Sequence, residues 1–311
     1  MSRTIEDTPS LKDAHKAEVL ANALKREAAR VLAQKLEPGL YVVATPIGNL
    51  GDISIRALAT LALADIVYCE DTRHSARLLQ HYGLQPVTRP LHDHNEEAEL
   101  KRVLIELGRG KSIALISDAG TPLVSDPGFK LVRACVAAGH AVTALPGPSA
   151  VMSALSVSGL PTDAFFFAGF LAPKQAARRA RIAELKTIPA TLIFFEAPQR
   201  VAESLADLAD VLGDRPAVMA RELTKLHEEL ARGGLKTLAV QIAERDMKGE
   251  IVLVVAPPGE RVVGDDEIVA RLELALSSMR MKDAAAAVAD ALGVSKSRVY
   301  DLGLKLKGQA E

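Results

Sequence analysis

The chain has 311 residues and carries 38 basic and 39 acidic side chains, which gives a formal net charge of −1. This balance excludes a protein that coats nucleic acid by its overall charge, although a local basic area can still hold RNA. Hydrophobic residues make up 49% of the chain, which excludes global disorder. No apolar run approaches the roughly 20 residues of a membrane helix, so we expect a cytoplasmic protein with no membrane partner.

Residues 1–38 are rich in Ala, Lys, Glu and Arg and predict an extension that is helical or partly disordered. From residue 39, short β-branched runs alternate with amphipathic stretches. The expected strands are 41–44, 66–69, 113–116 and 141–145, and the expected helices are 54–63, 72–82, 96–107 and 128–138. Asp52 is the candidate cap of the first of these helices. The alternation is typical of an α/β domain with a largely parallel sheet, which we place at residues 39–158.

A second α/β domain is expected over residues 159–260, after a Gly- and Pro-containing turn. Its expected strands are 164–168, 192–195, 217–220 and 251–255, with helices near 178–185, 201–212 and 237–243. Residues 261–311 are expected to form a small helical unit similar to a helix-turn-helix. In that unit, helices at 267–277 and 283–292 precede a third helix that Ser295 can cap.

Loops rich in Gly, Pro and carboxylates follow the strands of the first domain. They read T-P-I-G-N-L-G-D at 45–52, E-D-T-R at 70–73, S-D-A-G-T-P-L-V-S-D-P-G at 117–128 and L-P-G-P-S-A at 145–150. Because ligands of parallel sheets bind beyond the carboxyl ends of the strands, these loops indicate one ligand site rather than four unrelated turns. The dinucleotide motif G-x-G-x-x-G and the P-loop motif are absent, which disfavours both enzyme classes.

These loops resemble those of the ribosomal RNA small subunit methyltransferase I family, in the tetrapyrrole methylase superfamily. The segments F-F-E-A-P-Q-R at 194–200 and A-R-E-L-T-K-L-H-E-E at 220–229 continue the resemblance, which covers roughly residues 39–306. It implies two α/β domains with S-adenosylmethionine in the cleft between them. It also implies 2′-O-methylation of a decoding-centre cytidine in 16S ribosomal RNA of the small subunit. The cofactor-binding residues that it implies are Pro46, Gly48, Asn49, Asp118, Ala119, Gly120, Thr121, Pro122, Ser149, Ala150, Phe167 and Phe195.

A ribose hydroxyl is a weak nucleophile, so a positioned base or cation should assist the transfer. Lys225 is the first candidate, either to stabilise the alkoxide or, if desolvated, to act as the base. Glu196 and Glu228 are the next candidates, and the alternative is that such charges only form ion pairs. His92 and His94 lack an evident third ligand, and the two cysteines form no C-x-x-C pair, so we expect no metal.

Basic residues are concentrated at 174–186 and in the C-terminal unit, where they predict phosphate contacts or, alternatively, a solvated helix face. The expected RNA-binding residues are Asp71, Arg73, Asn95, Lys174, Arg178, Arg179, Arg221, Lys296 and Arg298. The resemblance leaves two competing functions: a tetrapyrrole C-methyltransferase, and a nucleic-acid-binding regulator with a vestigial methylase body. A homodimer is compatible with the sequence.

Overall fold

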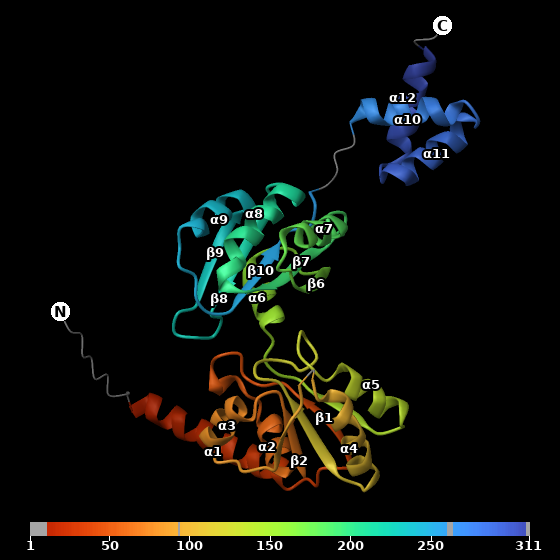
Figure 1. Ribbon diagram of the computed structural model, residues 1–311. Coiled ribbons are helices and arrows are strands. Elements are labelled where there is room, and N and C mark those ends of the chain that lie inside the picture. Colours follow the sequence, from red (N-terminus) through yellow and green to blue (C-terminus); the bar gives the residue numbers. More distant parts are fainter. Residues whose placement is uncertain (1–10, 93, 260–263, 309–311) are drawn as a thin grey trace, which may run out of the picture. The chain divides into compact units, whose positions relative to one another are not determined.

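The computed structural model describes residues 11–92, 94–259 and 264–308. The chain forms two compact units, residues 1–257 and 258–311. The first unit contains two five-stranded sheets with their helices, and the second is helical (Figure 1). None of the described helices is long and apolar enough to cross a membrane.

The first sheet is entirely parallel and has the strand order β3-β2-β4-β1-β5. Its strands are β1 (Gly39–Val43), β2 (Ile66–Cys69), β3 (Thr88–Pro90), β4 (Ser112–Ile116) and β5 (Val142–Leu145). The short edge strand β3 has no counterpart among the predicted strands, whereas the parallel sheet itself is confirmed. All five carboxyl ends therefore lie along one edge, which brings the loops that follow β1, β4 and β5 together.

Helices cover both faces of this sheet. Helices α2 (Ile55–Leu63) and α3 (Thr72–His81) pack on one face, and α4 (Glu96–Gly108) and α5 (Phe129–Ala137) pack on the other. Helix α1 (Leu11–Leu32) contacts α2. The predicted cap of α2 is wrong. Asp52 lies in a 3-10 turn, η1 (Leu50–Asp52), and the Ser54 hydroxyl accepts the cap hydrogen bond from the Ala57 amide at 3.1 Å.

The second sheet is mixed and has the order β6-β7-β10-β8-β9. Its strands are β6 (Phe165–Phe170), β7 (Thr191–Glu196), β8 (Pro216–Arg221), β9 (Glu229–Gly234) and β10 (Ile251–Val255). Only β6 and β7 pair in parallel. Strand β9 was not predicted, because its sequence E-L-A-R-G-G lacks β-branched residues and ends in two glycines, both unfavourable in strands.

One face of the second sheet is covered by α7 (Gln175–Leu185), α8 (Val201–Leu212) and α9 (Leu235–Ala243). The other face is covered by α6 (Ala150–Ser158), whose Val151, Ala154 and Leu155 pack against strands β7, β8 and β10. The sequence places α6 in the first domain, whereas its apolar face contacts the second sheet. The change from one sheet to the other therefore precedes α6 rather than following Ser158.

The C-terminal unit consists of α10 (Asp265–Leu276), α11 (Met281–Leu292) and α12 (Lys296–Gly308). A small core that includes Ile268, Leu272 and Val299 holds the three helices together. Gly293 adopts a left-handed φ of 65° at the end of α11, and the Ser295 hydroxyl accepts a hydrogen bond from the Arg298 amide at 3.4 Å. The predicted helix-turn-helix arrangement is confirmed by these elements.

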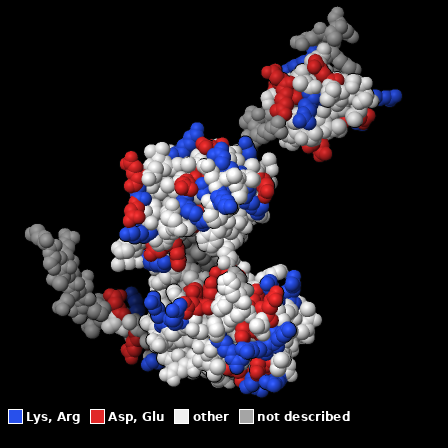
Figure 2. Space-filling model, viewed as in Figure 1, with Lys and Arg blue, Asp and Glu red and all other residues white. Residues whose placement is uncertain are grey.

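The prediction that Arg178 contacts RNA is wrong. Its side chain is 1% exposed, and its Nε donates to Asp207 Oδ2 at 2.7 Å, with Glu203 at 3.2 Å from Nη2. Asp207 is equally buried and also accepts from Arg179. The packing of α7 on α8 encloses this pair, so Arg178 holds the two helices together and is not available to a phosphate. Basic and acidic side chains accordingly lie side by side over α7 and α8 (Figure 2).

Replacing Arg178 with alanine should lower the free energy of unfolding by about 3–5 kcal/mol, because Asp207 would lose its buried partner. Urea denaturation of the full chain measures this change. The matched control is Arg181→Ala in the same helix, whose exposed pair with Glu184 should contribute less than about 1 kcal/mol. Equal effects of the two substitutions would contradict a structural role that is specific to Arg178.

Candidate functional site

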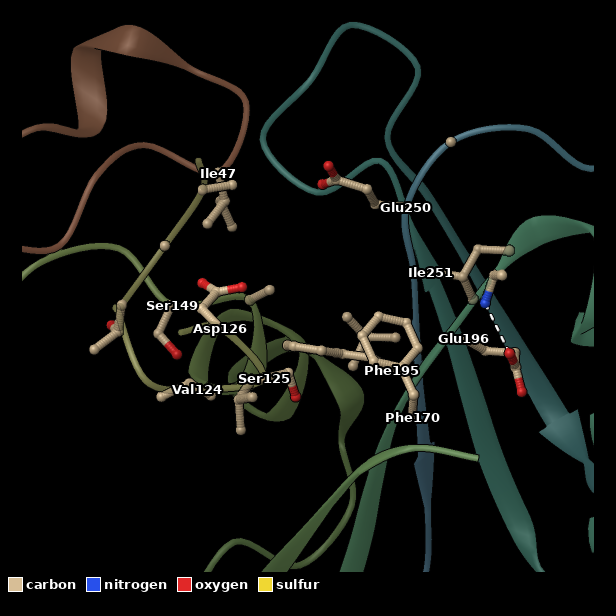
Figure 3. A pocket seen from close by; sticks show the side chains of 18 of the residues that line it. Ile47, Val124, Ser125, Asp126, Ser149, Phe170, Phe195, Glu196, Glu250 and Ile251 are labelled. Atoms are coloured by element: carbon tan, nitrogen blue, oxygen red, sulfur yellow. Dashed lines mark hydrogen bonds between the residues drawn. The ribbon is translucent and has the colours of Figure 1, made fainter. Parts of the chain in front are cut away.

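The loops that follow the parallel strands meet the second sheet around a cavity of about 280 Å³ (Figure 3). From the first sheet it is lined by the loops after β1, β4 and β5. From the second sheet it is lined by the ends of β6 and β7 and by the start of β10. The lining side chains and backbone come from Ile47, Ala119, Gly120, Thr121, Val124, Ser125, Asp126, Ser149, Ala150, Val151, Phe170, Phe195, Glu196, Ala197, Pro198 and residues 249–252.

Backbone contacts fix the loop after β4 at this cavity. The amide and carbonyl of Gly120 pair with the carbonyl and amide of Thr45, at 3.0 and 2.8 Å. The Thr121 hydroxyl donates to the Pro148 carbonyl at 3.2 Å, which joins the loops after β4 and β5. Gly120 has a φ of 79°, and an added Cβ would lie 3.3 Å from Ile47. Gly120 is thus buried in the wall of the cavity, where a bulkier residue would be strained.

An aromatic wall closes the side formed by the second sheet. The ring of Phe195 meets Phe167 edge-on, with centroids 4.8 Å apart, and meets Phe170 at 5.5 Å. Phe195 and Phe170 line the cavity directly, whereas Phe167 supports Phe195. The cavity therefore combines an apolar wall with a peptide-lined one, as small-molecule sites commonly do.

A second, more polar cavity of about 450 Å³ adjoins the first and shares Ile47, Ala119 and Glu250 with it. It lies beyond the carboxyl ends of β1 and β4 and beside α3. Its other lining residues are Thr45, Pro46, Gly48, Leu50, His74, Ser75, Arg77, Leu78, Ile116, Ser117, Asp118 and Lys225.

Lys225 reaches this second cavity from the loop after β8. Its Nζ lies 2.8 Å from Glu222 Oε1 and 3.2 Å from Glu250 Oε2. Its chain crosses Gly48 so closely that a Cβ on Gly48 would overlap Lys225 Cγ. Burial lowers the pKa of Lys225, but the carboxylates of Glu222 and Glu250 outweigh burial and hold that pKa above its ordinary value. Lys225 is therefore an ammonium at neutral pH, and the expectation that it acts as a base is not supported.

Two other predicted catalytic residues form hydrogen bonds with residues near them in the chain. The Glu196 side chain is fully buried, and its carboxylate accepts from the Ala197 amide at 2.8 Å, from Ser204 at 2.5 Å and from Arg200 at 2.8 Å. Glu228 is exposed, lines neither cavity and accepts from the Thr224 amide at 2.7 Å. Both carboxylates stabilise local structure, and neither lines the cavity that contains Lys225.

The predicted cofactor residues divide between the two cavities. Ala119, Gly120, Thr121, Ser149, Ala150 and Phe195 line the first, and Pro46, Gly48 and Asp118 line the second. Asn49 and Pro122 line neither. The Asn49 side chain accepts from the Gly51 amide at 3.0 Å, and Pro122 is buried within its loop.

Sequence reasoning missed Asp126, Phe170 and residues 249–252. Asp126 lies in the S-D-A-G-T-P-L-V-S-D-P-G loop at 117–128, so the sequence did contain a signal for it. For residues 249–252, no motif marks the segment.

Backbone strain is concentrated around the two cavities. Among the described residues, the non-glycine positions with a left-handed φ are Leu123 (73°), Ser125 (68°), Glu222 (51°) and Thr224 (67°). They lie in the loop after β4 and in the loop after β8, which carries Lys225. Such positions cost about 1–3 kcal/mol each and persist where the surroundings impose them, commonly at functional sites.

Several residues that were predicted to contact RNA have their hydrogen-bond or ion-pair partners within the protein. Asp71 caps the start of α3 and pairs with Arg73 at 2.8 Å, and the Arg73 guanidinium holds the pKa of Asp71 well below its usual range. Asn95 closes a turn by accepting from the His92 amide at 2.9 Å and donating to the Pro90 carbonyl at 3.1 Å. Within the described part of the chain, no group of three or more potential ligands could hold a metal ion.

The remaining predicted RNA contacts are of two kinds. Arg179, Arg221 and Arg298 pair with carboxylates: Arg179 with Asp207 and Asp210, Arg221 with Glu229, and Arg298 with Asp265. Lys174 and Lys296 are exposed and have no ion pair with any described residue.

Comparisons with known proteins agree with this architecture. The family described as tetrapyrrole (corrin/porphyrin) methylases matches residues 39–239, and the family described as the RsmI C-terminal HTH domain matches residues 262–307. A protein of Mesorhizobium japonicum named ribosomal RNA small subunit methyltransferase I is 50% identical over 278 residues, which cover 88% of this chain and 94% of that protein. A Vibrio cholerae protein of the same name is 47% identical, with coverage of 88% and 96%.

A solved structure titled cobalt precorrin-4 methyltransferase is similar in fold, with a TM-score of 0.54 and 16% identity. The match covers 70% of this chain and 94% of that one.

Replacing Thr224 with glycine should raise the free energy of unfolding by about 1 kcal/mol. The left-handed backbone costs a non-glycine residue roughly 1–2 kcal/mol, which exceeds the roughly 0.5–1 kcal/mol that glycine loses in chain entropy. The Thr224 hydroxyl is also buried without a hydrogen-bond partner, so its removal breaks no bond. Urea denaturation provides the measurement.

The control is the same substitution at Thr237, which is exposed in α9 and has no left-handed φ. There, glycine should lower the free energy of unfolding by about 0.5 kcal/mol through helix propensity. A destabilised Thr224→Gly variant would show that the loop is not strained.

Proposed function

Because the chain belongs to the ribosomal RNA small subunit methyltransferase I family, within the tetrapyrrole methylases, we propose that it methylates the 2′-hydroxyl of a decoding-centre cytidine in 16S ribosomal RNA, using S-adenosylmethionine. The observation that carries this proposal is the pair of adjoining cavities, one apolar and lined by loop backbone, the other polar and containing the Lys225 ammonium.

The first cavity fits S-adenosylmethionine in its chemistry. Gly120 lines this cavity without a side chain, at a point where a Cβ would meet Ile47, and Thr121 and Ser149 contribute hydroxyls to the lining. Phe195 provides an aromatic surface for a purine. When bound, this cofactor supplies a methyl group on a sulfonium, which needs no further activation. The protein has mainly to hold the acceptor in line, which is worth roughly 7–11 kcal/mol in well-oriented systems.

The second cavity suits the acceptor nucleotide. Arg77 is exposed at its rim and has no ion pair with a described residue, so it is free to contact a phosphate. Lys225 has three N–H donors, of which one donates to Glu222 Oε1 at 2.8 Å, while Glu250 Oε2 lies at ion-pair distance. A further donor is left for the ribose oxygen. The ammonium would stabilise the negative charge that develops on this oxygen as it attacks.

The C-terminal unit favours RNA over a porphyrinoid as the acceptor. It matches the helix-turn-helix domain of the family, and a single porphyrinoid does not require such a unit. Lys174 and Lys296 are our candidates for phosphate contacts, since Arg179, Arg221 and Arg298 would first have to leave their carboxylate partners.

The direct test is methyl transfer from labelled S-adenosylmethionine to small ribosomal subunits from a strain that lacks this gene. Nuclease digestion and mass spectrometry should locate the label on the 2′-oxygen of one decoding-centre cytidine. Porphyrinoid precursors form the control arm and should stay unlabelled. Label on a base, on another nucleotide or on a porphyrinoid would contradict the proposal.

The variant Lys225→Ala should lower the single-turnover rate by about 10²–10³-fold, the usual effect of removing preorganised charge. The affinities for the cofactor and for RNA should persist. Lys225→Arg should restore little, because a guanidinium differs from an ammonium in shape and in hydrogen-bond geometry.

The matched control is Lys248→Ala, since Lys248 is 81% exposed beside the same region and forms an ion pair with the equally accessible Asp246. This variant should keep the wild-type rate. If Lys225→Ala instead keeps its rate but binds RNA weakly, Lys225 is a phosphate contact and has no role in the transfer step.

A further inference from the structure

Three carboxylates line the first cavity, and one of them differs from the others. Glu196 pairs with Arg200 at 2.8 Å, and Glu250 pairs with Lys225 at 3.2 Å. Asp126 forms no ion pair with any residue in the described ranges. Of the three lining carboxylates, it is therefore the one that no described cationic side chain pairs with.

The surroundings of Asp126 disfavour an isolated negative charge. In Figure 3 its carboxylate is directed into the pocket, toward the side on which Ile47 lies, with Val124 and Phe195 among the other labelled residues. Burial raises the pKa of the Asp126 carboxyl, and the nearby charge of Asp118 raises it further, against an opposing effect of the Ser117 hydroxyl. A cation that entered this cavity would relieve both effects.

The backbone holds Asp126 there at a cost. Leu123 and Ser125 precede it with left-handed φ values of 73° and 68°, and Gly128 follows with a φ of 119°. A Cβ on Gly128 would lie 2.8 Å from Leu115, so the turn is fixed against the core. Backbone strain of this kind is concentrated at active sites and ligand-binding positions, and here it holds a carboxylate at the wall of a cavity.

We propose that Asp126 is the counter-charge for the sulfonium of S-adenosylmethionine, and that it makes the protein bind this molecule in preference to S-adenosylhomocysteine. This inference rests on the proposed function. A sulfonium has no N–H donors to satisfy, so one carboxylate in an apolar wall suffices for it, whereas an ammonium has three donors. After methyl transfer Asp126 faces a neutral thioether and is again unbalanced, which favours release of the product.

The test is calorimetric titration of the full chain, without RNA, with S-adenosylmethionine, S-adenosylhomocysteine and sinefungin, which carries an ammonium where the cofactor carries its sulfonium. Asp126→Asn should weaken binding of the two cationic ligands by about tenfold or more, the range that an opposite charge at close contact produces. Its affinity for S-adenosylhomocysteine should remain that of the wild type. Asp126→Ser should show the same pattern of affinities, and it replaces Asp126→Asn in the experiment if the asparagine variant unfolds.

Glu250→Gln is the matched control, because Glu250 lines the same cavity but already has a cationic partner. It should leave the ratio of the two affinities unchanged. Equal weakening of all three ligands by Asp126→Asn would place the carboxylate on the ribose or the amino group and overturn the inference, as would no weakening at all. Wild-type protein that binds none of the ligands would overturn the proposed function and this inference with it.

Discussion

The candidate site depends on how closely the loop after β1 approaches the loop after β8. Gly48 leaves room for the Lys225 side chain, which could not take its position over any residue with a Cβ. That contact brings an ammonium from the second sheet to the carboxyl edge of the first. Glu222 and Glu250 then hold the ammonium through two ion pairs. With a side chain at position 48, Lys225 would be displaced and the polar cavity would lose its ammonium.

The same packing decides what every other charge near the site can do. Glu196 forms an ion pair with Arg200 and accepts a hydrogen bond from Ser204, so its carboxylate stabilises the turn after β7. Arg178 forms a buried ion pair with Asp207 between the helices of the second α/β domain. Asp126 has no ion pair with any residue that the structure describes. Charged residues that look equivalent in the sequence thus take different roles. Arg178 forms a buried ion pair, Glu196 stabilises a turn, and Asp126 stays available to a ligand, because packing places different neighbours beside each of them.

Strain and function coincide in two loops. Both carry non-glycine residues with left-handed φ, and both line the cavities where we propose methyl transfer. The parallel sheet and its helices supply a rigid base that can impose such conformations. In the proposed reaction each reactant has its own cavity. The cofactor lies against backbone and aromatic side chains in the first, and the acceptor lies beside an ammonium in the second. The shared wall at Ile47, Ala119 and Glu250 keeps the two halves adjacent.

Much of the fold follows from the sequence alone, because its signals act within a few residues. Runs such as 66–69 and 251–255 predict their strands to the residue, and Gly- and Pro-rich loops indicate the ligand edge. Tertiary structure decided the rest. The assignment of α6 to the second sheet, the strands β3 and β9, the left-handed residues and the pairing of Arg178 depend on contacts between distant segments. Arg178 and Asp207 are 29 positions apart, and Gly48 meets Lys225 from a different sheet. No local pattern records which charge finds a partner, since that is set by which helices and loops pack together.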